Sequence, residues 1–103
     1  MSRAGKQRGF EADTLRLLAE IHARLDSPER PGAEAFYREA LALAGELGMR
    51  PLVARCHLGL GRLYRQAGEG AAAKEHLSTA RTMLAQMEMR FWLEEAEVEL
   101  TLT

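Results

Sequence analysis

The residues of this chain that could take part in chemistry are one cysteine, three histidines, and groups of glutamates and glycines. Cys56 and His57 are adjacent in a segment with helical spacing, so their side chains point about 100° apart and cannot easily share a metal ion. His22 and His76 fall in two other helical segments, and the sequence contains no His-x-x-x-His or Cys-x-x-Cys pair. We therefore expect these histidines to lie in the core or in a groove, with no metal and no cofactor.

The glutamates and glycines also favour structural roles over catalytic ones. Four glutamates between positions 94 and 99 could suggest acid–base catalysis, but on a helix such residues face water, and the early ones favour the helix dipole. Gly59 and Gly61 lie within helical spacing that no strand precedes, and residues 68–74 lack the spacing of a phosphate-binding loop. No nucleophile stands beside a base and an orienting carboxylate. We predict that the chain is not an enzyme.

The bulk composition predicts a single globular domain. The 103 residues are 47% hydrophobic and 28% charged, which is typical of a folded chain of one domain. A net charge of −1 gives no field that would attract nucleic acid or an anionic membrane, and no apolar run approaches the roughly 20 residues of a membrane span. The lone Cys56 allows no internal disulfide, so we expect a cytoplasmic protein. Residues 1–9 show no hydrophobic period, and we expect a mobile N-terminal arm there.

From Phe10 onwards the spacing of apolar residues predicts an all-α fold. Apolar residues recur three and four positions apart, and no stretch alternates long enough to be a strand. Gly48 and Gly68 stand where glycine ends a helix, and Pro51 stands where a first turn accepts proline. We predict a first hairpin over about 10–48, a second over about 51–89, and a closing helix over about 91–101.

The chain also repeats itself. A shift of 40 positions pairs Ala40 with Ala80 and Leu60 with Leu100, while a shift of 42 pairs Ala19 with Gly61. One hairpin cannot bury both faces of its helices, so copies stack and share a core. The small residues at these positions would let helices approach closely, Ala19 and Gly61 within a hairpin and the two alanines between hairpins.

The repeated residues resemble the tetratricopeptide repeat (TPR). The resemblance rests on the succession Leu60-Gly61, Tyr64, Gly68, Ala73, Leu77, Ala80, with Leu18, Ala19, Tyr37, Ala40 and Trp92 at the corresponding packing positions. The repeat is nearer 40 residues than the usual roughly 34, and it is similar to the longer variety in the C-terminal arrays of bacterial signalling regulators that carry cyclase-like or DNA-binding outputs and an ATPase module. The resemblance implies a right-handed superhelix of two repeats plus a closing helix, and a non-enzymatic scaffold that binds a protein or peptide, as the terminal part of a regulator's array.

The resemblance also implies a concave groove lined by the first helix of each hairpin. Projected onto this chain, that groove would be lined by Arg16, Glu20, Arg24, Arg55, Leu58, Arg62, Arg65, Gln66 and Val98. Arginines at helical spacing would attract an acidic or carboxylate-bearing segment. The alternative is that these arginines are solvated or pair with nearby glutamates. The chain has no asparagine, so the asparagine-dependent clamp that some relatives use for chaperone C-termini is not expected.

Two further functions are compatible with the sequence. The helix around Leu15–Leu25 has apolar residues on more than one face, and such an end of a stack needs covering, which predicts self-association through it. The chain would then be a structural cap or a homodimerisation module without a groove ligand. A small helical enzyme or ligand-binding bundle would need inward-facing polar groups, for which the apolar stripes offer only His22, His57 and Tyr64.

Overall fold

The structure, a computed structural model, describes residues 2–25 and 30–102, with side chains described over 9–24 and 32–102. Within these ranges the chain is all helical and contains no strand, as the spacing of apolar residues predicts. The helices are α1 (Ser2–Leu25), α2 (Arg30–Leu47), α3 (Arg50–Gln66), α4 (Gly70–Gln86) and α5 (Arg90–Leu102).

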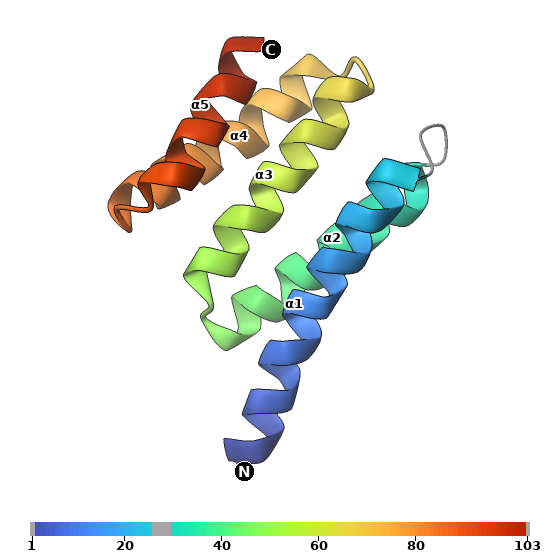
Figure 1. Cartoon of the computed structure of the whole chain (residues 1–103), viewed down its shortest axis with the longest axis vertical. Helices are drawn as coiled ribbons and strands as arrows, with labels where there is room; N and C mark the ends of the chain where they lie inside the picture. Colours follow the sequence, from blue (N-terminus) through green and yellow to red (C-terminus); the bar gives the residue numbers. More distant parts are fainter. Residues whose placement is uncertain (1, 26–29, 103) are drawn as a thin grey trace.

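The helices form an open stack of two layers. Each helix packs on its neighbour in the sequence, and α3 also touches α1 and α5. Figure 1 shows α1, α3 and α5 side by side in front, with α2 and α4 behind them. In the described ranges, no residue of α1 comes within 8 Å of α4 or α5 between Cα atoms. The stack is therefore not a closed bundle, and one face of the front layer stays open.

Three turns of the same kind connect α2 to α5. At each turn, one residue takes positive φ: Gly48 (69°), Gly68 (80°) and Glu88 (56°). At each, the next residue donates its N–H to the carbonyl five positions back, over 2.8–3.0 Å, as in a Schellman motif. Gly48 and Gly68 thus end their helices as predicted. These turns lie 20 positions apart, half the sequence repeat.

Of the three residues with positive φ at these turns, Glu88 is the one that is not a glycine, so a residue with a side chain adopts left-handed backbone there. A non-glycine residue there costs roughly 1–2 kcal/mol, so Glu88→Gly is expected to raise the free energy of unfolding by about 1 kcal/mol, as measured by urea denaturation. The matched control is Glu94→Gly in the exposed part of α5, which should lower it by a similar amount because glycine weakens a helix interior. A loss of stability in Glu88→Gly would contradict this account of the turn.

Several predicted boundaries need correction. The expected arm over residues 1–9 is helical from Ser2, and in Figure 1 its turns project beyond α2 as part of α1. The spacing predicts a turn over 26–32 and a second helix from residue 33, but this helix begins at Arg30, because a first helical turn accepts proline. Residues 26–29 of that turn lie outside the described residues. The fourth helix ends at Gln86 rather than at residue 89, because Glu88 reverses the backbone.

Small residues let the helices nest. A Cβ atom added to Gly61 would lie 2.5 Å from Leu77 Cγ, across the α3–α4 hairpin, and one added to Gly59 would lie 2.3 Å from the Tyr37 ring, between the hairpins. Gly61 therefore packs within its hairpin, as predicted. Of the predicted packing residues, the following are buried: Ala19, Tyr37, Ala40, Leu60, Gly61, Tyr64, Ala73, Leu77 and Ala80. Leu18 and Trp92 are half-buried, while Gly68 is exposed and serves its turn.

Candidate functional site

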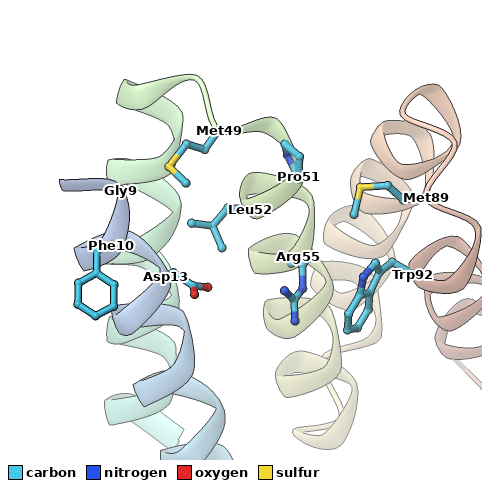
Figure 2. A pocket seen from close by; sticks show the side chains of 9 residues that line it. All are labelled: Gly9, Phe10, Asp13, Met49, Pro51, Leu52, Arg55, Met89 and Trp92. Atoms are coloured by element: carbon cyan, nitrogen blue, oxygen red, sulfur yellow. The ribbon is translucent and has the colours of Figure 1, made fainter. Parts of the chain in front are cut away.

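A groove runs along α3 between α1 and α5. It consists of three adjoining hollows that share residues: Arg55 and Trp92 line the first two, and Tyr37, Gly59 and Arg62 line the second and third. The first hollow measures about 550 Å³, the second is a constriction of about 10 Å³, and the third measures about 130 Å³. Figure 2 shows the first hollow, with α1 on one side, α5 on the other and the first turns of α3 between them.

Two predicted groove residues are buried at the constriction of the groove. Leu58 is 2% exposed and belongs to the core, so little of its side chain is open to a partner. Arg16 is 6% exposed and is held by two carboxylates of its own helix, Asp13 at 3.1 Å and Glu20 at 3.2 Å. A guanidinium this deep in the protein needs such partners, and its charge is already balanced.

The arginines in the middle of α3 pair with glutamates of α5. Arg62 donates to Glu95 Oε1 at 2.5 Å and to Glu99 Oε2 at 3.0 Å, and Arg65 donates to Glu99 Oε1 at 2.7 Å. The alternative in which the arginines pair with nearby glutamates therefore holds for these two. The expected basic groove is corrected to one whose middle is close to neutral. The sequence predicts a solvated face for Glu95 and Glu99, whereas their i, i+4 spacing places both on the side of α5 that meets Arg62.

Glu99 should matter for stability because two guanidinium groups share it while its side chain is only 13% exposed. We expect Glu99→Gln to lower the free energy of unfolding by about 1 kcal/mol, since both partners remain partly in water. Glu97→Gln, an exposed neighbour on the same helix, should change it by less than about 0.5 kcal/mol. If both substitutions change the free energy of unfolding equally in chemical denaturation, the ion pairs of Glu99 add nothing to stability.

Arg55 differs from Arg16, Arg62 and Arg65, which contact carboxylates. Its guanidinium lies 4.1 Å from the centre of the Trp92 ring, a distance at which a cation is attracted to the face of an aromatic ring. In the described part of the chain, Arg55 has no carboxylate oxygen within 4.0 Å. Burial, followed by the charge of Arg16, lowers the pKa of Arg55, while the charges of Glu20 and Asp13 oppose this shift. Its positive charge is half-buried, and no described carboxylate contacts it.

The remaining predicted residues line the third hollow or lie outside the groove. Arg24 and Gln66 are exposed and line the third hollow together with Glu20 and Arg62. Val98 is 56% exposed but lines none of the three hollows. The groove thus has a polar end near Gln66 and an apolar end that the sequence did not reveal. That apolar end is formed by Phe10, Leu52, Trp92 and the two turn methionines, Met49 and Met89.

Two of the three histidines meet, although the sequence placed them on separate helices. The Nδ1 atoms of His57 and His76 lie 3.0 Å apart, and the Tyr64 ring stacks on His76 at 5.5 Å. The hydroxyl of Tyr64 donates to Glu34 and accepts from Arg38, so a polar network joins α2, α3 and α4. Among the described residues, no group of three or more His, Cys, Asp or Glu is arranged to hold a metal ion.

The histidine pair should make stability fall in mild acid. Burial first, and then the neighbouring His76, lowers the pKa of His57; burial and then Arg38 lower the pKa of His76, with Glu75 and Glu34 opposing. Because the pKa values of both histidines in the folded protein lie below their ordinary value of about 6.5, the unfolded chain binds protons first as the pH drops. Urea midpoints should therefore decrease below about pH 6.5. The slope should be shallower in His76→Gln, and an equal slope in both proteins would contradict the assignment.

Cys56 does not have the properties of a nucleophile. Its side chain is fully buried, and burial raises its pKa to about 12, so the thiol stays protonated near neutral pH. The other residues of its buried cluster are Ala12, Ala40, Ala44 and Leu52. Cys56 therefore fills space where α1, α2 and α3 meet.

Over the described ranges, none of the helices combines the length and the apolar character that crossing a membrane requires. Comparison with protein-family models, curated proteins and solved structures finds no match to this chain.

Proposed function

We propose that this chain is a protein–protein interaction scaffold of the tetratricopeptide-repeat kind, with two hairpins and a closing helix in a right-handed stack. The open two-layer packing supports this proposal, as do the three Schellman turns 20 positions apart and the glycines that nest against Tyr37 and Leu77. A unit built from such hairpins exposes one continuous face of its first helices, and repeat proteins bind partners on that face.

The observation that carries the proposal is the groove along α3. Its walls come from α1 and α5 and its floor from α3, so the chain has to be stacked for the groove to exist. Its middle is lined by ion pairs that leave little net charge, and its end near Gln66 is polar. Its other end, near Phe10, is apolar and holds Arg55, which no described carboxylate contacts. A groove with this pattern suits an extended partner segment of mixed polar and apolar residues better than a segment that is acidic along its whole length.

The setting of the scaffold is part of the proposal. Its resemblance to the C-terminal arrays of bacterial signalling regulators supports a role as the terminal part of such an array, in the cytoplasm. The absence of catalysis is also proposed: the buried Cys56 thiol and the paired Glu95 and Glu99 have structural roles that explain their presence.

Site-specific photo-crosslinking tests the scaffold. A photoreactive phenylalanine analogue replaces Gln66, which is exposed in the groove, or Ala42, which is exposed on α2 in the other layer. In the native cells we expect a discrete protein adduct from position 66 and none from position 42. Adducts from position 42 alone, or from neither position, would contradict binding through the groove.

An exposed stripe on α1 favours homodimerisation as a second candidate function. Phe10, Leu17 and Ile21 are 76%, 44% and 49% exposed. The shift of 42 equates Leu17 and Ile21 with Gly59 and Leu63, which are buried on α3. The face of α1 that carries Leu17 and Ile21 is therefore exposed, whereas the corresponding face of α3 packs against α2. Analytical ultracentrifugation should show a dimer that Leu17→Glu/Ile21→Glu abolishes and Leu102→Glu on α5 does not; a monomer at high concentration would contradict it.

A further inference from the structure

The first hollow of the groove is an apolar pocket of the size that holds a ligand group. Its volume of about 550 Å³ lies in the range of roughly 300–1,000 Å³ found for ligand pockets. Figure 2 shows Phe10 on the α1 side and Trp92 on the α5 side, with Leu52 between them and the methionines of two turns at the upper rim. Phe10 is 76% exposed, so a large apolar side chain entering the pocket would cover it.

Arg55 brings to this pocket a positive charge that no described carboxylate contacts. Arg16, Arg62 and Arg65 are each within 3.2 Å of a carboxylate oxygen, whereas Arg55 rests against Trp92 and has none within 4.0 Å in the described part of the chain. Asp13 also lines the pocket, but Arg16 binds it at 3.1 Å and offsets its charge. A carboxylate reaching Arg55 would supply the missing partner through charge-assisted hydrogen bonds.

The backbone adds to the preference for an anion at this end. Both α3 and α5 begin beside the pocket, at Arg50 and Arg90, directly after the rim residues Met49 and Met89. Neither helix has an acidic residue in its first turn, and Met49 makes no side-chain cap hydrogen bond. The partial positive charges of two helix N-termini therefore lie at the rim of the hollow that Arg55 lines.

The pocket also continues into the rest of the groove. Arg55 and Trp92 line both the pocket and the constriction, from which the third hollow leads towards Gln66. A compact small molecule would occupy only the pocket, whereas a chain can place one side chain there and extend along α3. The shape thus favours a segment of polypeptide.

We propose that this pocket binds a short linear segment of a partner in which a large apolar side chain stands beside an aspartate or glutamate. The apolar side chain fills the space between Phe10 and Trp92, and the carboxylate binds the Arg55 guanidinium. This inference rests on the proposed scaffold function and specifies the chemistry that the groove selects.

The experiment uses an array of blocked synthetic hexapeptides in which the two central residues take all pairs of natural amino acids. Binding is confirmed in solution through the fluorescence of Trp92, the one tryptophan of the chain, which lies in the pocket. We expect pairs of Phe, Leu, Met or Trp with Asp or Glu to bind best, to change Trp92 emission and to weaken as salt rises. Replacing Asp by Asn or Glu by Gln in the best peptides should weaken binding about tenfold or more.

Variants of the protein locate the binding site. Arg55→Gln should weaken the best peptides about tenfold or more, while Arg55→Lys should retain part of the affinity because the positive charge remains. Phe10→Ala, at a position that is 76% exposed, should weaken binding several-fold. Arg81→Gln, at an exposed position on α4 outside the groove, should leave it unchanged.

Three results would overturn the proposal. They are the absence of any binding pair, a best set without acidic residues, and affinities that Arg55→Gln and Phe10→Ala leave unchanged. If photo-crosslinking at position 66 nevertheless captures a partner, the scaffold function stands and only the specificity of the pocket is wrong. If crosslinking at position 66 fails as well, the proposed function falls with it.

Discussion

We expect Leu77→Ala to lower the free energy of unfolding by about 2–5 kcal/mol, the usual cost of emptying space in a packed core. Leu77 is fully buried and belongs to the larger core cluster, where α3, α4 and α5 share apolar residues. Its Cγ and Cδ2 atoms occupy the space that a side chain on Gly61 would need. Chemical denaturation monitored by circular dichroism gives the number directly, and Leu102→Ala, at a 62% exposed position, should change it by less than about 0.5 kcal/mol.

The same pair of residues tests the nesting of the hairpin in a double-mutant cycle. Gly61→Ala alone is expected to destabilise, because the added methyl group would start 2.5 Å from Leu77. In the Leu77→Ala background, the same substitution should be neutral or stabilising, since the space is empty and alanine favours the helix by about 1 kcal/mol. The coupling should be about 1–3 kcal/mol. Additive effects would mean that Gly61 and Leu77 do not oppose each other across the hairpin.

The second large effect on the free energy of unfolding is expected when glycine is replaced by alanine, with opposite signs at two positions. Gly59→Ala should lower the free energy of unfolding by about 2 kcal/mol, because its methyl group would start 2.3 Å from the buried Tyr37 ring, which cannot move aside easily. Gly45→Ala, in the exposed part of α2 with nothing within 4 Å of the new methyl group, should raise it by about 0.5–1 kcal/mol.

Changes of opposite sign in the free energy of unfolding would show that Gly59 is needed for close packing and that Gly45 is not. Gly59 lies where the two hairpins meet, so its variant also reports on the contact that holds the stack together. If both substitutions stabilise the protein, α3 does not approach α2 as closely as the structure has it. Thermal unfolding would serve as a second measurement, with the two variants shifting the midpoint in opposite directions.

The secondary structure was largely predictable because its causes are local. Apolar spacing identified every helix, and Gly48 and Gly68 marked two ends correctly because left-handed backbone favours glycine. The third turn was misplaced because Glu88 adopts the same left-handed backbone although it is not a glycine. Packing residues such as Gly61 and Ala80 were also predicted correctly. The repeat pairs Gly61 with Ala19 and Ala80 with Ala40, and all four residues are buried.

The site was less predictable because its partners are distant in the sequence. Arg62 binds glutamates 33 and 37 positions away, and His57 meets His76 across 19 positions. Helical periodicity says which way a side chain points from its own helix, but not which side chain of another helix it meets. The apolar pocket was missed for the same reason, since α1, α3, α5 and two turns each contribute a part of it.

By itself, the sequence determined that the described chain is built of helices, where most of them end, and which small residues allow close packing. These properties depend on neighbours within about one helical turn and on backbone sterics, which any chain of this sequence carries with it. The tertiary structure alone decided which arginines are neutralised and which one remains without a carboxylate beside an apolar pocket. That outcome depends on α5 lying against α3, because an ion pair requires its two groups within a few ångströms and the chain order does not specify that distance.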